Sequence, residues 1–221
     1  MRTLIVNFKN YPEILGEGSV RLAEAVQRVA GQFHVEAIVA PPIPMLSLVA
    51  WRVKVPVYSQ TVSSESGEKT TGAILIESVR AAGASGTILN HSESTMPILD
   101  LRRLVPKLDA AGMDVCLCAR TTKEAVRLTS LGTKYLAIEP PQLIGSGIAV
   151  SKAKPGLIRD TVTEVRKAGY KGRVLCGAGI VSGEDVERSI ELGAEGVLVA
   201  SGVVKSGDWE SKLRELAHPL S

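Results

Sequence analysis

The sequence repeats one pattern along its whole length: a short apolar run rich in β-branched residues, followed by a segment with helical periodicity. Eight runs are candidate strands, at residues 3–8, 36–40, 55–60, 86–90, 114–118, 135–138, 173–176 and 196–200. Their first residues are on average about 28 positions apart, which is close to the length of a strand, a crossover helix and the return to a parallel strand. Strands that alternate with helices predict a parallel sheet.

Glycines indicate where the predicted helices end. Six of them follow a helical pattern and precede a strand, namely Gly31, Gly83, Gly112, Gly132, Gly169 and Gly193. Helices commonly end in a left-handed residue, a conformation that glycine adopts at little cost. We therefore expect each of these glycines to terminate a helix.

Eight strand–helix units in 221 residues predict an α/β fold, a (β/α)8 barrel that forms a single domain over residues 1–221. The alternative is a doubly wound open sheet. No G-x-G-x-x-G motif follows the first run, and polar groups follow strands throughout the chain instead of gathering at one switch point. The closed barrel is therefore favoured.

Polar side chains collect where predicted strands end, which is where barrel enzymes build their active sites. Alternation along the first run places Asn7 and Lys9 on one face. His91 follows the fourth run and precedes a sequence typical of a helix start, whose positive end favours a neutral imidazole. Glu139 ends an apolar strand, so we expect burial to raise its pKa toward the range of a general base.

Three loops add to these candidates. Residues 140–147 begin with two prolines and end in glycines, a pattern that predicts a lid. Loops at 177–180 and 200–203 follow the last two strands, where small residues let backbone N–H groups approach a phosphate. The polar connection 61–72 is long enough to suggest a role of its own.

Composition excludes several classes of function. The net charge is +3 and no block of like charges is present, so neither a nucleic-acid arm nor a disordered tail is expected. The apolar N-terminal stretch is too short for a signal sequence or a membrane span. Cys116, Cys118 and Cys176 lie in apolar runs and are interpreted as buried thiols of a reducing compartment, with no metal site. A cytoplasmic protein is expected.

Five motifs together resemble the triosephosphate isomerase family, in the short form typical of archaea. They are Asn7-x-Lys9, Asn90-His91-Ser92-Glu93, Ile138-Glu139-Pro140-Pro141-x-Leu143-Ile144-Gly145, Cys176-Gly177-Ala178-Gly179-Ile180 and Val199-Ala200-Ser201-Gly202. The resemblance covers essentially the whole chain in order. It implies the interconversion of D-glyceraldehyde 3-phosphate and dihydroxyacetone phosphate through an enediolate, a step of glycolysis and gluconeogenesis, with no metal and no cofactor.

The resemblance also implies a role for each site residue. Glu139 would move the proton, His91 would polarise the carbonyl, Lys9 would supply positive charge and Glu93 would orient that lysine. Asn7 would place the substrate. Phe8, which lies between Asn7 and Lys9 in the sequence, would also be a substrate-binding position. The remaining implied phosphate-binding positions are Ile144, Gly145, Gly179, Ala200 and Ser201.

The sequence departs from the family pattern after Glu93. Ser94 and Thr95 stand where many relatives carry an arginine, so an ion pair that supports Glu93 is expected to be absent. Ser146 replaces a threonine common in the lid. The family also implies a homodimer or homotetramer, with loop 61–72 reaching a second subunit.

Two alternatives remain open from the residues alone. The late glycine loops also fit a sugar-phosphate epimerase or lyase, which would need metal ligands or a Schiff-base lysine inside the barrel. The missing arginine also fits a barrel that binds a phosphorylated metabolite without converting it.

Overall fold

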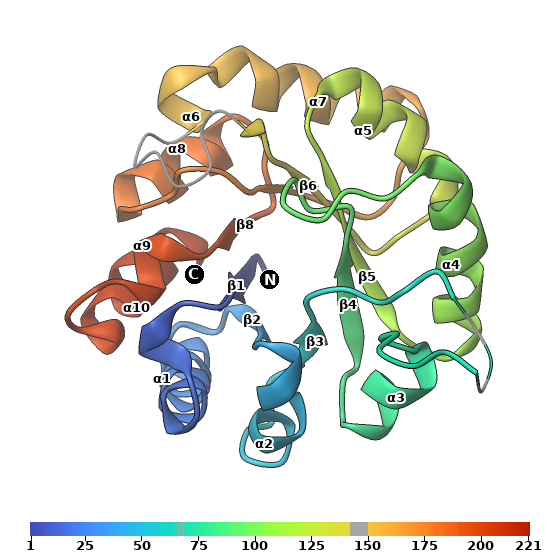
Figure 1. Ribbon diagram of the computed structural model, residues 1–221. Helices are drawn as coiled ribbons and strands as arrows, with labels where there is room; N and C mark the ends of the chain where they lie inside the picture. Colours follow the sequence, from blue (N-terminus) through green and yellow to red (C-terminus); the bar gives the residue numbers. More distant parts are fainter. Residues whose placement is uncertain (66, 68, 142–149) are drawn as a thin grey trace.

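A computed structural model of the chain describes residues 1–65, 67, 69–141 and 150–221, and its strands form one parallel barrel (Figure 1). The strands are β1 (Thr3–Asn7), β2 (Glu36–Ala40), β3 (Tyr58–Ser59), β4 (Gly86–Leu89), β5 (Asp114–Ala119), β6 (Tyr135–Ile138), β7 (Arg173–Cys176) and β8 (Gly196–Val199). Each strand lies where the sequence predicts one. The (β/α)8 fold is therefore confirmed.

The strand order is β2-β1-β8-β7-β6-β5-β4-β3, and every pairing is parallel. A parallel bridge between Val39 of β2 and Val57, just before β3, connects the two ends of this order, so the barrel is nearly closed. The predicted third strand, 55–60, shortens to two residues. Pro56 explains part of this difference, because proline has no N–H to donate to a ladder, although its carbonyl accepts the Val39 N–H at 3.1 Å.

Helices surround the barrel (Figure 1). They are α1 (Glu17–Phe33), α2 (Leu46–Ala50), α3 (Ile76–Ala81), α4 (Ile98–Ala110), α5 (Thr122–Leu128), α6 (Val150–Ala153), α7 (Pro155–Lys167), α8 (Gly183–Glu191), α9 (Ser201–Val204) and α10 (Trp209–Ala217). Short 3-10 helices span Pro12–Ile14, Ile43–Met45, Thr129–Leu131 and His218–Leu220.

Five of the six predicted helix-ending glycines have a positive φ, and one does not. The prediction for Gly31 is wrong, since α1 continues through it to Phe33 and His34 takes the left-handed conformation instead. No side chain or backbone crowds Gly31, so nothing there requires a glycine.

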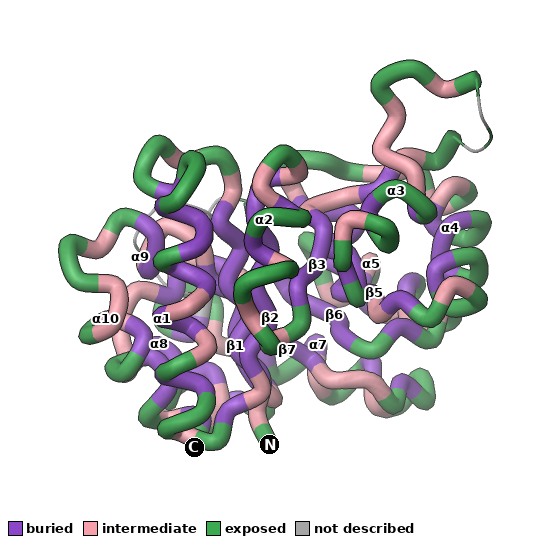
Figure 2. The backbone as a smooth tube through the Cα atoms, turned by 90° about the horizontal axis from the view of Figure 1, so that it is seen from below, coloured by how far each residue is buried: buried purple, intermediate pink, exposed green. Residues whose placement is uncertain are grey.

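Two apolar layers hold the barrel together, and Figure 2 shows the buried strands inside the exposed outer faces of the helices. The interior is filled by side chains from all the strands, namely Ile5, Ile38, Ala40, Tyr58, Ile88, Cys116, Cys118, Tyr135, Ala137, Leu175 and Leu198. A larger cluster lies between the strands and the helices. Because strand residues alternate between these two layers, both faces of the sheet are apolar.

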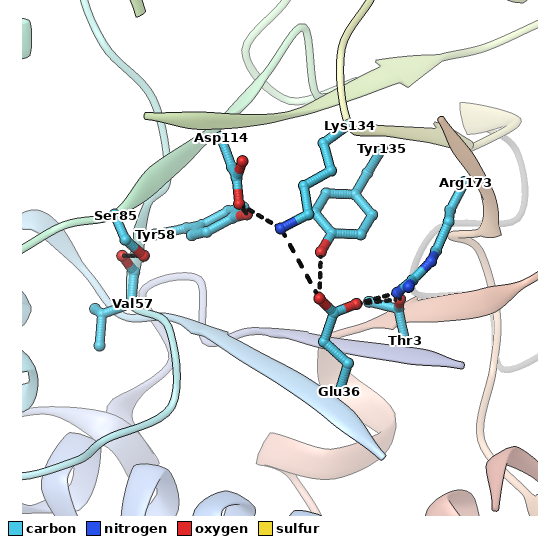
Figure 3. Close-up of polar contacts among 9 residues, drawn as sticks. All are labelled: Thr3, Glu36, Val57, Tyr58, Ser85, Asp114, Lys134, Tyr135 and Arg173. Atoms are coloured by element: carbon cyan, nitrogen blue, oxygen red, sulfur yellow. Dashed lines mark hydrogen bonds and ion pairs between the residues drawn. The ribbon is translucent and has the colours of Figure 1, made fainter. Parts of the chain in front are cut away.

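A polar network closes the end of the barrel where the strands begin (Figure 3). At its centre Glu36 accepts hydrogen bonds from Tyr135 Oη at 2.9 Å, from Thr3 Oγ1 at 2.7 Å and from Arg173. Lys134 binds Asp114 at 2.7 Å beside it. Both chain termini lie at this end, and Arg2 donates to the carbonyl of Pro219 at 2.9 Å (Figure 2). This network lies at the start of the strands and does not occupy the opposite end of the barrel, where the strands finish.

None of the helices in the described ranges combines the length and the hydropathy needed to cross a membrane.

Candidate active site

The side chains singled out from the sequence meet at the carboxyl ends of the strands. Lys9, His91 and Glu139 line one cavity together with backbone from the loops after β7 and β8. The other lining residues are Gly177, Gly179, Ile180, Val181, Leu198, Val199, Ala200 and Ser201. Residues far apart in the chain therefore form one site because the parallel strands all end there.

Glu139 is a carboxyl group held out of water. It follows β6 directly, its backbone N–H donates to the carbonyl of Ala119 at 2.7 Å, and its residue is 1% exposed. Neither carboxyl oxygen accepts a hydrogen bond of normal geometry from a described residue. Burial raises its pKa to about 7, although the nearby Cys118 thiol and Lys9 favour the charged form. The predicted rise in pKa is present, and it brings this carboxyl into the range of a general base.

The shape of the loop after β7 makes room for this carboxyl. A Cβ atom on Gly177 would lie 2.5 Å from Glu139 Cγ and 2.9 Å from Oε1. Any side chain at position 177 would therefore displace the carboxyl group. Glycine is required here by close approach and not by backbone conformation.

His91 is buried and presents one nitrogen to the cavity. Its Nδ1 accepts a hydrogen bond from the N–H of Glu93 at 3.1 Å, so the proton of the neutral ring resides on Nε2. Nε2 lies 3.7 Å from Glu139 Oε2. Burial and the charge of Lys9 lower the pKa of His91, with Glu93 acting in the opposite sense. The neutral imidazole is thus an N–H donor at neutral pH.

The expected cause of that neutral ring is wrong. The sequence placed a helix start directly after His91, but α4 begins only at Ile98, and Ser94 donates to the His91 carbonyl in a turn. Pro97 explains the delay, because the residue before a proline disfavours helical geometry. Burial and Lys9 therefore replace the helix terminus as the reason for the low pKa.

Lys9 is held by Glu93, as the resemblance implied. Its Nζ lies 2.6 Å from Glu93 Oε1, and the lysine side chain is mostly buried while Glu93 is 57% exposed. Lys9 adopts φ +50°, a left-handed backbone conformation that is strained for a residue other than glycine. Asn7 stabilises this turn, since its Oδ1 accepts the Lys9 N–H at 3.0 Å.

Gln60 is a site residue that the sequence did not single out. Its side-chain amide lies within hydrogen-bond distance of the Lys9 carbonyl at 3.0 Å, the Ala40 carbonyl at 3.1 Å and Asn7 Oδ1 at 3.3 Å. It stands just after β3 and so closes the same end of the barrel. The only sequence signal was its position at the end of a predicted strand.

The late loops offer backbone donors to an anion. Gly179 has φ +72°, and no acceptor in the described part of the chain bonds the N–H groups of Gly179, Ala200 or Ser201. Buried Asp185 shapes the first of these loops, because its Oδ2 accepts the N–H of Val181 and of Ser182 at 3.0 Å each. This arrangement of backbone donors is suited to a phosphate group.

The other predicted positions divide into two groups. Phe8 is fully buried in the apolar core between strands and helices, so its side chain is not part of the cavity. Ile144, Gly145, Ser146 and most of the predicted lid lie outside the described residues.

The described residues include no group of three His, Cys, Asp or Glu side chains arranged to hold a metal ion. The expectation that no metal or cofactor is used stays a prediction. All three cysteines are free and buried.

The fold and the site define a barrel enzyme whose cavity holds one buried carboxyl with a raised pKa, one neutral N–H donor and backbone N–H groups that have no acceptor among the described residues. The family model described as triosephosphate isomerase matches residues 2–216. The chain belongs to the triosephosphate isomerase family.

Curated relatives match over nearly full length. The triosephosphate isomerase of Caldivirga maquilingensis is 42% identical over 98% of this chain and 96% of its own. That of Pyrobaculum calidifontis is 45% identical over 98% of this chain and 95% of its own, and that of Methanothermus fervidus is 41% identical over 96% of both chains. These relatives support the short form recognised in the sequence.

Proposed function

We propose that this protein is a triose-phosphate isomerase, an aldose–ketose isomerase that interconverts D-glyceraldehyde 3-phosphate and dihydroxyacetone phosphate. The observation that carries the proposal is the pair formed by Glu139 and His91. A buried carboxyl with a pKa of about 7 lies 3.7 Å from the N–H nitrogen of a neutral imidazole, in a cavity lined in part by Gly179, Ala200 and Ser201, whose backbone N–H groups have no acceptor among the described residues.

The chemistry needs only a proton shuttle. Glu139 removes a proton from the carbon next to the carbonyl, and His91 Nε2 donates to the carbonyl oxygen as it gains charge. The proton of the adjacent hydroxyl then moves to this first oxygen through His91, and Glu139 returns its proton to the former carbonyl carbon, so the second oxygen becomes the new carbonyl. Substrate and product have the same composition, so no oxidant, reductant or cofactor enters the reaction.

A positive charge near the oxyanion and a binding site for the phosphate complete the requirements of the reaction. Lys9, oriented by Glu93 and supported by Asn7, adds positive charge beside the oxyanion. The backbone N–H groups of Gly179, Ala200 and Ser201 bind the phosphate, and the family resemblance adds Ile144 and Gly145, which lie outside the described residues. This reaction belongs to glycolysis and gluconeogenesis.

A coupled assay tests the proposal. Purified protein turns over glyceraldehyde 3-phosphate, and Glu139→Gln lowers kcat by on the order of 10²-fold or more, because the amide cannot accept the proton. Glu187→Gln, the same change on an exposed side chain of α8, is the matched control and retains parental activity. In D₂O the product carries deuterium at the carbon that was protonated.

Two results would contradict the proposal. Full activity in Glu139→Gln would show that Glu139 is not the base. Tight binding of a phosphate ester with no turnover by the parent protein would instead indicate a barrel that only binds a phosphorylated metabolite.

We also propose that the chain folds as one domain over residues 1–221, works in the cytoplasm without nucleic acid or membrane, and assembles as a homodimer or homotetramer. Free buried thiols support the reducing compartment. The residues on both sides of positions 66 and 68 run outward beside α3, which supports a role of loop 61–72 in contacts with a second copy (Figure 2). Light scattering measures the number of subunits.

A further inference from the structure

The residue before the catalytic histidine is held by contacts with the neighbouring strand β5 and with helix α5. Asn90 directly follows β4, is 2% exposed and adopts φ +57°. Its amide nitrogen donates to the carbonyl of Cys118 at 2.9 Å and to Glu124 Oε1 at 3.1 Å. Its amide oxygen accepts the N–H of Met96 at 3.0 Å. The side chain thus uses both of its N–H groups and its carbonyl oxygen.

These contacts fix the loop that carries His91. A left-handed conformation costs a residue with a side chain roughly 1 kcal/mol or more, and asparagine tolerates it best when its amide is bonded locally. Met96 lies at the far end of the loop, so the Asn90 side chain ties the start of residues 90–96 to their end. The direction of the imidazole depends on the backbone that Asn90 sets.

Glu124 is itself rigidly held. It lies in the first turn of α5, where its N–H donates to the capping Thr121 Oγ1 at 3.2 Å. Its Oε2 accepts from the Arg120 backbone N–H at 2.8 Å, and Arg120 Nη2 donates to Oε1 at 2.8 Å. Partial burial by itself raises the pKa of Glu124, but hydrogen bonds from Arg120 and Asn90 outweigh it and leave that pKa below the usual range. The acceptor for Asn90 therefore stays ionised at neutral pH.

This support comes from an element that the sequence motif does not include. Residues 94 and 95 are Ser and Thr, so no cation follows Glu93 directly. Instead, Glu124 of α5 bonds Asn90 at the start of the same loop, and Arg120 from the β5–α5 connection bonds Glu124. The Arg120–Glu124 pair is spaced i,i+4, and it differs from an ordinary surface pair in its contact with buried Asn90 and in the backbone N–H that Glu124 also accepts.

We propose that Glu124 is a positioning residue for His91, acting through the side-chain amide of Asn90 to hold the catalytic loop in its working geometry. The inference rests on the proposed isomerase function. Neither Glu124 nor Asn90 lines the cavity, so both act through His91 and not on the substrate.

Turnover is the first test. Glu124→Ala lowers kcat by about 10-fold to 100-fold, since small displacements of a catalytic group are costly, while KM changes less than about twofold because the phosphate-binding backbone is untouched. Glu124→Gln keeps an acceptor oxygen for Asn90 and retains most of kcat. The matched control is Glu210→Ala, which breaks an i,i+4 pair with Arg214 on α10 and leaves kcat at the parental value.

A double-mutant cycle tests the route through Asn90. Glycine adopts φ +57° without help from a side chain, so Asn90→Gly removes the link to Glu124 while keeping the backbone conformation accessible. In that background Glu124→Ala changes kcat by less than about twofold. A full additional loss in the double variant would overturn the proposal, because Glu124 would then act by another route such as the Arg120 backbone. A parental kcat in Glu124→Ala would also overturn it.

A spectroscopic readout keeps the inference separate from the proposed function. The chain has three histidines, so the NMR signals of the His91 imidazole ring are assigned by comparing spectra of the parent protein and of His91→Gln. In Glu124→Ala these signals shift or broaden, and in Glu210→Ala they do not. Unchanged His91 signals would overturn the inference in an active or an inactive protein, whereas an inactive parent protein with the expected signals would overturn the proposed function alone. If Glu124→Ala does not fold, Arg120→Ala weakens the same acceptor and gives smaller effects in the same direction.

Discussion

Glu139 is the proposed base of the reaction, and the pKa of its carboxyl group, about 7, determines how activity depends on pH. Only the ionised form accepts a proton, so we expect kcat/KM to rise with pH, about tenfold per unit below pH 7, and to level off above it. A further slope from ionisation of the substrate phosphate, near pH 6, is identified by titrating the substrate alone. A kcat/KM that does not change between pH 5.5 and 8 would contradict the raised pKa.

The same raised pKa predicts a cost in stability. The pKa of the Glu139 carboxyl is about 7 in the folded protein and 4.5 without the fold, so the unfolded chain ionises first as the pH rises. Folding therefore loses stability between about pH 4.5 and 7, by on the order of 3 kcal/mol at about 1.4 kcal/mol per unit. Glu139→Gln has no charge to bury, so its free energy of unfolding relative to the parent protein should increase by about that amount from pH 4 to pH 8.

Urea unfolding at the two pH values measures this difference. Glu187→Gln on exposed α8 serves as the control and should show no such change. A relative stability of Glu139→Gln that stays constant with pH would show that folding does not raise the pKa of this carboxyl.

At the scale of the elements, the positions of all eight strands could be predicted, because β-branched runs and their spacing are local properties of the sequence. The errors have local causes as well. Pro56 delays the start of β3, and Pro97 delays the start of α4 until Ile98. Gly31 was interpreted as a helix end although α1 passes through it, since a glycine in a helix interior gives the same signal as one that follows it.

Gly31 and Gly112 make a matched pair for a prediction about helix ends. Both are exposed and have no atom near the place of a Cβ, but Gly31 is helical whereas Gly112 has φ +69°. Gly31→Ala should stabilise the protein by about 0.5–1 kcal/mol, because alanine loses less backbone freedom on folding. Gly112→Ala should destabilise it by about 1 kcal/mol, because alanine in the left-handed region is strained. Chemical denaturation of both variants checks the opposite signs, and equal signs would show that the conformation of the two sites does not differ.

At the scale of the whole molecule, the barrel explains which part of the site the sequence reveals. Lys9, His91 and Glu139 follow strands, and parallel strands bring such residues to one end, so their meeting could be predicted. The contacts of Gln60 and the link from Asn90 to Glu124 could not, because they join side chains across strands and leave no periodic pattern in the chain. Residue type at a strand end is local information, whereas hydrogen-bond partners depend on the closed barrel.

The two ends of the barrel should respond differently to mutation. Glu36 lies at the end opposite the cavity, where it accepts hydrogen bonds from Tyr135, Thr3 and Arg173 and so joins β1, β2, β6 and β7 (Figure 3). Glu36→Ala removes these acceptors, which leaves the Tyr135 hydroxyl without an acceptor among the described residues and the Arg173 guanidinium with only Thr3 Oγ1 at 2.7 Å. We expect a loss of about 2–3 kcal/mol in the free energy of unfolding, because stranded polar groups are costly.

The same variant should keep its parental kcat and KM at a temperature where it is folded, since no residue of the cavity contacts Glu36. His91→Gln is the complementary variant, with turnover lowered by on the order of 10²-fold and little change in stability. Urea unfolding and steady-state kinetics on both variants separate the two effects. A fall in kcat of folded Glu36→Ala would mean that the network at the start of the strands helps to shape the site at their ends, and that the barrel is not divided into a stabilising end and a catalytic end.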